Sequence, residues 1–581
     1  MREPRAGSTR WATLAVLCVS LLIVSLDNTV LNVALPTLVR DLHASSSGLQ
    51  WVMDAYAVVF AGLLLVQGSL GDRFGRKWVF LAGLVVFAAG SAASAFSQTT
   101  GMLVGARAFM GIGAAAIMPS TLSILTNVFV DARERARAIG IWSGTTGLGL
   151  AIGPIVGGWL LTHFWWGSVF LINVPIAALG IVAAVWLVPN SRQETASPQD
   201  PVGAGLSIGG MVLLLWGIIE APNRSWTSPY VLGAIVGGLA VLTGFVRWEH
   251  RTAHPMLELA FFRSRRFSVA MVAMALVIFS LMGSLFLLTQ YLQFALGYSP
   301  LQAGLRIMPI AGILLVAAPL SSVLAERLGT RVVVTVGMGL IAGGLFALAR
   351  TGVHGTYATA LPGFALLGLG TGLAFAPSTE SIMGSLPPDR AGVGSATNSA
   401  GLQIGGALGV GVLGSLLATR YQSHLAPLLA KASAPHSAVV LVLGSLGGAQ
   451  AVAQHVGGAL GAALRTAAVS AFVSGLDLAM VVGGAVVAAA AVAVAVALPA
   501  RGGAVAGGGG AVAGGGRAGG DDPEQADLSR AGSRGTGDSG TGDSGTGDSG
   551  TFDGLAGVAV PVAPEAAPTR TMPDPGERHG R

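Results

Sequence analysis

Long runs of apolar residues, separated by short polar connections, fill most of the first 498 residues of this chain. A helix needs about 20 mostly apolar residues to cross the hydrocarbon core of a bilayer. We expect a membrane-spanning helix in each run of roughly that length. These runs cover approximately residues 12–36, 47–69, 78–97, 102–127, 137–160, 164–188, 203–221, 229–247, 267–293, 300–325, 331–350, 357–383, 392–418 and 471–498. The sequence therefore predicts an all-α integral membrane protein with about fourteen spans.

The segments outside these runs differ in character. A basic start before the first run is typical of a signal peptide, but the run continues past Asp27 to Pro36 without a cleavage site, so we interpret it as the first span. In the connection at about 419–470, the apolar, Gly- and Ala-rich stretch 438–464 leaves open an extra re-entrant or surface helix. Residues 499–581 hold glycine tracts and tandem Gly-Thr-Gly-Asp-Ser repeats, which cannot bury a core, so we expect a disordered tail.

Composition agrees with a lipid environment. Hydrophobic residues make up 52% of the chain and charged residues 10%, against about 25% charged in a soluble domain. The net charge of +6 and a pI near 10 raise the possibility of nucleic-acid binding. We reject it, because the basic residues lie in short loops between apolar runs. Cys18 is the single cysteine, so we expect neither a disulfide framework nor a thiolate metal site.

The basic residues also predict orientation. They gather in alternate connections, and cytoplasmic loops carry an excess of Lys and Arg. The residues concerned are Arg73, Arg76, Lys77, Arg133, Arg135, Arg137, Arg192, Arg247, Arg251, Arg263, Arg265, Arg266, Arg327, Arg331 and Arg390. We therefore expect both termini in the cytoplasm of a cell whose plasma membrane holds the protein.

Asp27, Asp54 and Arg107 lie inside predicted spans. An ionisable residue there is costly and is a functional candidate by default. At about 1.5 Å per residue, Asp27 and Asp54 lie roughly 13 Å and roughly 10 Å below the outer ends of their spans. Burial favours the protonated carboxyl group, which suits a proton carrier. We expect Arg107 to pair with Asp27. The alternatives are an Asp54 or an Asp27 that lies at the membrane interface, and an Arg107 that is a static anchor.

Other charged residues lie in or near later spans. Glu380, near the inner end of the twelfth span, either contacts a cationic substrate or faces the cytoplasm, and both options stay open. Glu220 and Arg306 lie close to span ends, so we expect them at the membrane interface. Asp477 lies in the last span, and the sequence assigns it no role.

The connection between the second and third spans reads Gly68-Ser69-Leu70-Gly71-Asp72-Arg73-Phe74-Gly75-Arg76-Lys77. Gly71 and Gly75 permit a tight turn, and Asp72 is able to pair with a base across a helix interface. The basic residues alone would also serve as topology anchors. A partial copy, Ser322-Val323-Leu324-Ala325-Glu326-Arg327-Leu328-Gly329-Thr330-Arg331, follows the tenth span.

The fifth span contains a second pattern, in which four glycines surround a proline: Gly149, Gly153, Pro154, Gly157 and Gly158. Proline removes a backbone hydrogen bond and favours a kink, and glycines let a neighbouring helix approach closely. The loop G-x-L-x-D-R-x-G-R-K resembles the signature of the major facilitator superfamily. The pattern G-x-x-x-G-P-x-x-G-G resembles the antiporter signature of that superfamily's exporters.

Over about residues 12–498 the chain resembles the fourteen-span drug:proton antiporters of this superfamily. The resemblance implies an N-terminal six-helix bundle (12–188) after a short cytoplasmic segment (1–11), and two linking spans with a cytoplasmic loop (189–266). A C-terminal six-helix bundle (267–498) and the tail (499–581) follow. The sequence departs from the family at Met110, where members often have Gln. Gly167 and Ser168 likewise replace family residues before the element Phe170-Leu171-Ile172-Asn173-Val174-Pro175.

The resemblance implies a secondary exporter that works by alternating access around a central site. Asp27, Asp54 and Arg107 would couple transport to protons. Gly68, Asp72, Arg73, Gly75 and Arg76 would form a conformational latch. We expect an amphipathic small molecule as substrate, the proton gradient in place of a cofactor, and a monomer. The alternatives are export of an endogenous metabolite or siderophore, a proton-coupled importer, and a polytopic membrane enzyme, for which no nucleophile or phosphate-loop motif is present.

Overall fold

A computed structural model describes residues 7–191, 200–253, 255–353, 355–386, 391–432 and 434–498. Within these ranges the regular structure is entirely helical, and fourteen helices are long and apolar enough to cross a membrane. This confirms the expected fold class and number of spans. The tail predicted at 499–581 lies outside the described residues.

The helices of the first half begin with α1 (Gly7–Asp41) and include α2 (Ser46–Phe74), α3 (Arg76–Ala95), α4 (Thr100–Val128), α5 (Ala132–His163), α6 (Ser168–Leu171) and α7 (Asn173–Leu187). A pair, α8 (Pro201–Arg224) and α9 (Pro229–Arg251), follows. The second half contains η1 (Leu259–Arg263), α10 (Arg265–Gln290), η2 (Tyr291–Ala295), α11 (Pro300–Leu328), α12 (Thr330–Leu348), α13 (Tyr357–Met383), α14 (Ala391–Lys431), α15 (His436–Gly444), α16 (Leu446–Val456) and α17 (Gly458–Ala497).

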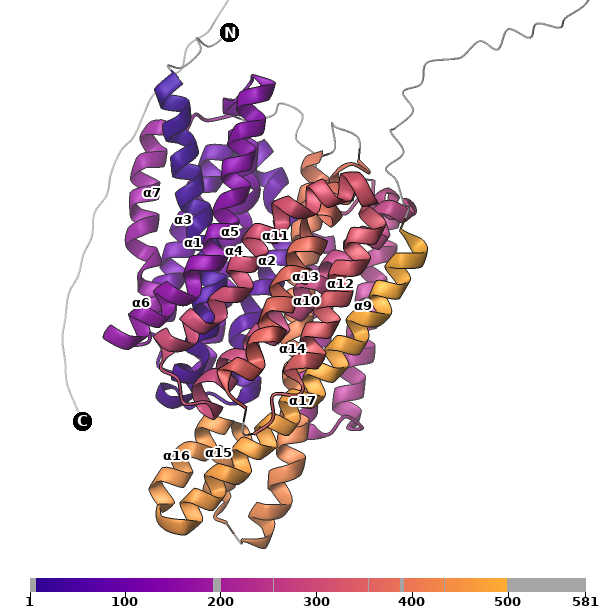
Figure 1. Cartoon of the computed structure of the whole chain (residues 1–581). Coiled ribbons are helices and arrows are strands. Elements are labelled where there is room, and N and C mark those ends of the chain that lie inside the picture. Colours follow the sequence, from indigo (N-terminus) through magenta and orange to yellow (C-terminus); the bar gives the residue numbers. More distant parts are fainter. Residues whose placement is uncertain are drawn as a thin grey trace, which may run out of the picture. The chain divides into compact units, whose positions relative to one another are not determined.

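Two bundles pack side by side (Figure 1). In the first, α1 packs on α5, and α4 packs on both α2 and α3. In the second, α10 packs on α14, and α13 packs on both α11 and α12. The bundles meet where α2 contacts α14 and where α5 contacts α11. The helices α8 and α9 pack on each other, and α8 also lies against α2 and α14. This pair is therefore an addition beside the two bundles.

A matching turn in each half supports an internal repeat. Helix α2 ends at Gly75, which has φ +102°, and α11 ends at Gly329, which has φ +86°. Both values lie in a region that favours glycine, because a side chain would clash there. The partial copy of the loop sequence in the second half thus repeats the positive φ of the glycine that follows the helix. Gly71 lies inside α2, so Gly75 alone makes the turn that we expected from both glycines.

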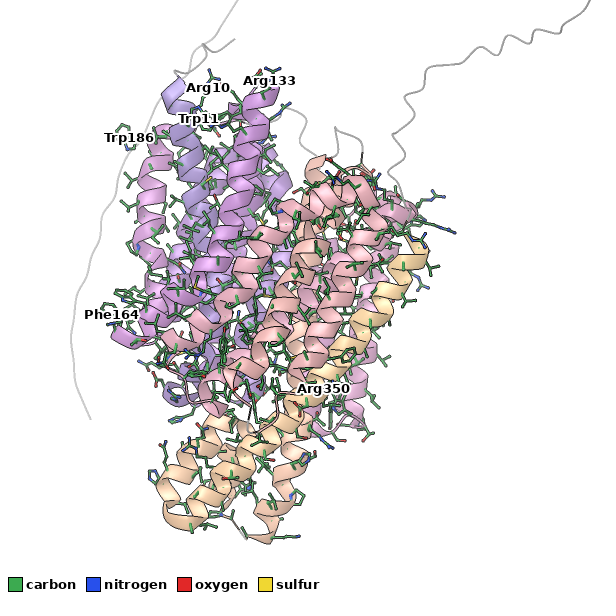
Figure 2. The ribbon with its side chains drawn as sticks, viewed as in Figure 1. Arg10, Trp11, Arg133, Phe164, Trp186 and Arg350 are labelled. Carbon is green, nitrogen blue, oxygen red and sulfur yellow. The ribbon has the colours of Figure 1, made fainter. Side chains whose placement is uncertain are left out.

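Two helices extend far beyond the predicted spans. Helices α14 and α17 contain 41 and 40 residues, about 60 Å each, against a hydrocarbon core of about 30 Å. Between them α15 and α16 form a helical hairpin, at the end of the molecule away from Arg10 (Figures 1 and 2). We call this end the hairpin end. The connection expected at 419–470 is therefore largely helical.

Exposed aromatic side chains mark both ends of the first bundle. Trp186, which is 80% exposed, lies toward the end that carries Arg10 and Arg133, and Phe164 lies toward the hairpin end (Figure 2). Trp and Tyr are enriched at the two membrane–water interfaces, and Trp165, which follows Phe164, is also exposed. Their placement agrees with helices that run across the bilayer between these two levels.

Candidate functional site

The central feature of the first bundle is a buried charge pair. The Arg107 guanidinium of α4 forms a salt bridge and hydrogen bond with the Asp27 carboxylate of α1. Each side chain is 1% exposed. A lone charge buried at this depth would be very costly, and an opposite charge in contact offsets much of that cost. The structure therefore contains the pair that the sequence predicted.

Further contacts fix the Arg107 side chain. Its Nε donates to the carbonyl oxygen of Val52 in α2 at 3.2 Å, and its guanidinium lies 4.3 Å from the centre of the Tyr56 ring. Met110, one turn along α4, places its sulfur 3.7 Å from Nη1. Met110 is the position at which the sequence departs from the family, and here it borders the charge pair directly. Arg107 thus ties α4 to α1 and α2.

Asn173 is a part of this network that sequence reasoning did not assign. Its amide donates to Ser91 Oγ at 3.0 Å and to Asp27 Oδ1 at 3.5 Å. Ser91 in turn donates to the carbonyl oxygen of Phe170 at 2.8 Å. The available signal was the Phe-x-x-Asn-x-Pro element, which contains both Phe170 and Asn173. The asparagine brings the start of α7 to the Asp27 carboxylate.

Asp54 of α2 has a different environment. It is 1% exposed, and neither carboxylate oxygen has a hydrogen-bond partner among the described residues. It lines a cavity of about 30 Å³ together with Arg107 and Asn28, and Met282 of α10 and Val410 of α14 close the cavity from the second bundle. A cavity of this size has room for water. Asp54 is therefore not interfacial but lies between the two bundles, beside the charge pair.

The glycines of α5 mark a close helix contact. A Cβ atom on Gly149 would lie 2.5 Å from Ser25 Cβ, and one on Gly157 would lie 2.9 Å from Val30 Cγ1. A Cβ on Gly153 would clash with Thr29 Oγ1, whose hydroxyl donates to the carbonyl oxygen of Gly149 at 3.2 Å. All three glycines therefore face α1, at residues that lie within one helical turn of Asp27.

The same helix also contacts the second bundle. A Cβ on Gly158 would lie 2.7 Å from the Leu301 Cα atom of α11. A Cβ on Gly304 of α11 would clash with the carbonyl oxygen of Pro154. Backbone of α5 and backbone of α11 are therefore in direct contact, and the residues of the antiporter pattern join the bundles at this point.

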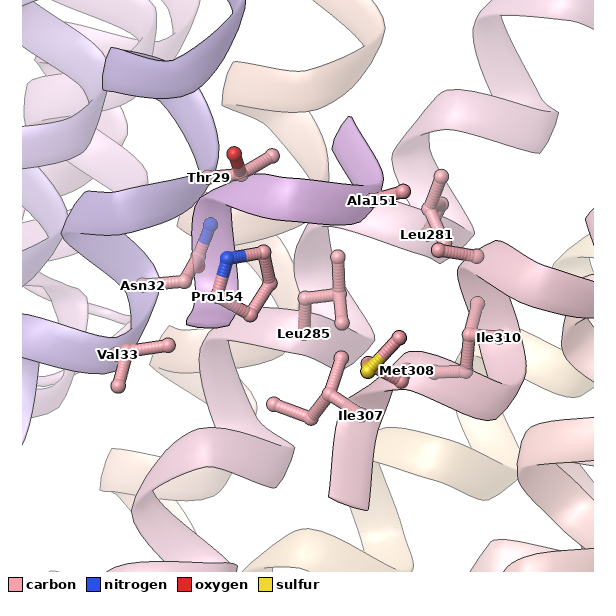
Figure 3. Close-up of a pocket in the computed structure, with 11 residues that line it drawn as sticks. Thr29, Asn32, Val33, Ala151, Pro154, Leu281, Leu285, Ile307, Met308 and Ile310 are labelled. Carbon is pink, nitrogen blue, oxygen red and sulfur yellow. The ribbon is translucent and has the colours of Figure 1, made fainter. Parts of the chain in front are cut away.

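Beside this contact lies a second cavity, between α1, α5, α10 and α11. It measures about 20 Å³ and is lined by Thr29, Asn32, Val33, Ala151, Pro154, Leu281, Leu285, Ile307, Met308, Ile310 and Ala311 (Figure 3). Ligand pockets for drug-sized molecules measure about 300–1,000 Å³. The bundles are therefore closed around this space, and a bound substrate requires them to separate.

The predicted latch lies at the other end of α2. Arg76 Nη1 donates to the Ser123 carbonyl oxygen of α4 at 3.3 Å, and Lys77 Nζ donates to the Val185 carbonyl oxygen of α7 at 2.7 Å. Arg73 is exposed. Gly68 and Asp72 both belong to α2, but the surroundings of Gly68 and the side chain of Asp72 lie outside the described part of the structure. The bases thus bind helix ends, and the proposed role of Asp72 stays a prediction.

The remaining candidates lie apart from the charge pair. Glu380 is exposed near the end of α13 and lines neither of the two cavities. Glu220 pairs with Arg224 at 3.5 Å. Arg306 stacks on Tyr298, with 3.8 Å between guanidinium and ring centre. A substrate contact by Glu380 therefore remains a prediction.

Two helical bundles that meet around buried charges define a polytopic membrane transporter. The whole arrangement resembles a solved bacterial homologue of the human lysosomal transporter Spinster, with a TM-score of 0.60, 17% identity, and coverage of 86% of this chain and 98% of that one. At this identity the likeness shows the fold.

Sequence comparison identifies the family. The model of the Major Facilitator Superfamily matches residues 17–410. The multidrug efflux pump LfrA of Mycolicibacterium smegmatis is 36% identical, over 82% of this chain and 94% of that protein. The tetracenomycin C resistance and export protein of Streptomyces glaucescens is also 36% identical, over 82% and 89%. The methyl viologen resistance protein SmvA of Salmonella typhimurium is 34% identical, over 72% and 84%. The chain belongs to the Major Facilitator Superfamily and is a membrane transporter, not an enzyme.

Proposed function

We propose that the protein exports amphipathic small molecules, drugs and antibiotics among them, in exchange for protons. The observation that carries the proposal is a pair of buried carboxyl groups near Arg107. Asp54 lines the cavity between the bundles together with Arg107, and Asp27 pairs with Arg107 inside the first bundle. Relatives named for multidrug efflux, antibiotic export and resistance to methyl viologen support the substrate class.

Protonation of Asp27 would change the balance of the charge pair. When the carboxylate accepts a proton, its charge attraction to Arg107 is lost. The guanidinium keeps the Val52 carbonyl oxygen, the Met110 sulfur and the rings of Tyr56 and Phe170. This local change in charge biases a two-state bundle. Asp54 has no partner that stabilises its charge, so it holds a proton in the closed structure and releases it when water enters.

The rest of the cycle follows from the contacts between the bundles. The α5–α11 contact at Gly158 and Gly304 closes the hairpin end. Separation there would expose the central site to one side of the membrane, and separation at the opposite end would expose it to the other. The bias of basic residues supports a cytoplasmic location for both termini in the plasma membrane, with the hairpin end outside.

One experiment tests the coupling. The purified protein is reconstituted into liposomes, a proton gradient is imposed, and transport of the fluorescent cation ethidium is followed for the wild type, Asp27→Asn and Asp54→Asn. We expect transport that depends on the gradient in the wild type and is uncoupled from it in both variants. Glu220→Gln removes a carboxyl group outside the site and serves as the matched control.

The outcomes separate the alternatives. Transport that ignores the gradient and survives both substitutions would refute proton coupling. Proton and dye moving in the same direction would indicate an importer. Proton coupling with a preference for a metabolite or siderophore over ethidium would retain the mechanism and change the substrate class.

A further inference from the structure

Gln50 is a buried polar residue of α2 that the proposed cycle does not use. Its side chain is 1% exposed and lies four residues before Asp54. The amide nitrogen donates to the carbonyl oxygens of Val410 and Gly411 at 3.2 Å each, and to Ser415 Oγ at 3.4 Å. All three acceptors belong to α14 of the second bundle. Gln50 therefore joins the two bundles by hydrogen bonds.

The facing stretch of α14 is shaped to receive this amide. A Cβ atom on Gly414 would clash with Gln50 Nε2, so a glycine at this position lets the amide approach the helix backbone. One turn away on α14, a Cβ on Gly411 would lie 3.6 Å from Asp54 Oδ2. The same short stretch of α14 thus covers both the Gln50 amide and the Asp54 carboxyl group.

The Gln50 contact lies between the Asp54 cavity and the hairpin end. Helix α2 begins at Ser46, which donates to the Gly444 carbonyl oxygen of α15 at 3.0 Å. Ser46, Gln50 and Asp54 follow one another at intervals of four residues, so they share one face of the helix. Val410, whose carbonyl oxygen accepts from Gln50, itself lines the Asp54 cavity. Water that enters from the hairpin end therefore meets Gln50 before it meets Asp54.

The second cavity has a matching contact. Gln293 of η2 is 3% exposed, and its amide donates to the Val33 carbonyl oxygen of α1 at 2.9 Å. Val33 lines that cavity (Figure 3). The next residue, Phe294, accepts a hydrogen bond from Gln450 of α16 at 2.8 Å, so η2 lies toward the hairpin end. Each cavity thus has one lining residue whose carbonyl oxygen accepts from a glutamine of the opposite bundle.

We propose that Gln50 and Gln293 are the gate residues of the hairpin end, and that release of Gln50 admits the proton that binds Asp54. The inference rests on the proposed exchange for protons, which requires the carboxyl group to reach water on one side at a time. An uncharged amide suits this role. When the bundles separate, water replaces the carbonyl oxygens as its partner, so neither conformation leaves the amide unpaired.

The access of water-soluble reagents to position 54 tests the gate without transport. Asp54→Cys is made in a Cys18→Ala background and labelled with a membrane-impermeant thiol reagent, from outside in intact cells and from the cytoplasmic side in inverted vesicles. We expect Gln50→Ala to raise the labelling rate from outside roughly tenfold, the effect of one to two lost hydrogen bonds. From the cytoplasmic side the rate should not rise.

Two further variants separate the gate from the loss of one side chain. Gly414→Ala keeps the Gln50 amide but places a Cβ where that amide lies, so we expect it to accelerate labelling in the same way. Gln290→Ala is the matched control, because this buried amide donates to the Phe286 carbonyl oxygen of its own helix at 3.0 Å; its labelling rate should equal that of the background. Val410→Cys lines the same cavity and replaces the first reporter if that variant does not fold.

The second glutamine is tested in the same way, with Gln293→Ala and the reporter Ile307→Cys in the other cavity. An outside labelling rate that neither Gln50→Ala nor Gly414→Ala raises would overturn the gate. Equal acceleration from both sides would also overturn it, because a loosened fold and not a gate gives that result. Ethidium transport that ignores the proton gradient in the wild type would instead refute the coupling, and a one-sided rise in labelling would still stand.

Discussion

Removal of one member of the Asp27–Arg107 pair should cost far more stability than removal of both. Asp27→Asn keeps the shape of the side chain but leaves the Arg107 guanidinium, 1% exposed, without a counter-ion. Breaking a buried pair in this way costs about 3–5 kcal/mol. Arg107→Met also leaves a buried charge unpaired and further loses the contacts with Val52 and Tyr56. The double variant contains no buried charge, and its loss should be smaller than that of either single variant.

A double-mutant cycle measures this directly. The free energy of unfolding is followed in mixed micelles by tryptophan fluorescence for the wild type, both single variants and the double variant. The partly exposed pair Glu220–Arg224 gives a control cycle with a coupling below about 1 kcal/mol. Asp27→Asn at wild-type stability would refute the reasoning, and so would a double variant whose loss equals the sum of the single losses.

Three further predictions concern the glycines and the latch. Gly153→Ala should reduce transport strongly, because the added Cβ would clash with Thr29. Gly144→Ala on the same helix places its Cβ in open space and should transport dye as the wild type does. Equal dye transport by the two variants would contradict the packing argument. Gly75→Ala should destabilise the protein by about 1–3 kcal/mol because φ is +102°, a loss that thermal unfolding in detergent would detect. Asp72→Asn should impair transport while the membrane-inserted amount on a blot stays normal, and normal transport would return the loop to a topology anchor.

The spans were predictable because lipid imposes a simple rule on composition. Every run of about 20 apolar residues became a helix, and the pairing of Arg107 followed from the cost of a buried charge. Contacts between residues far apart in the sequence were not predictable. Val410, which closes the Asp54 cavity, is far from Asp54 in the sequence, and no periodicity links them.

Helix ends were the least predictable feature. Within the connection at 419–470, the apolar stretch 438–464 left open an extra re-entrant or surface helix, and α15 and α16 are found there. The extension of α14 and α17 beyond their spans was not expected, because helical propensity in an Ala-rich segment continues without a need for lipid. Asn173 was likewise visible only as a member of a motif. Its hydrogen bond to Asp27 depends on the packing of α7 beside α1, a tertiary contact that composition does not encode.

The hairpin of α15 and α16 has a thermodynamic consequence. It accepts a hydrogen bond from Ser46 of the first bundle at Gly444, and donates one from Gln450 to Phe294 of the second. Each hydrogen bond contributes about 0.5–1.5 kcal/mol net. Together they favour the conformation in which the hairpin contacts both bundles by a factor of about 5–150 in the equilibrium constant. Because the hairpin extends beyond the spans, a molecule that binds it from the aqueous side would shift the conformational equilibrium without entering the bilayer.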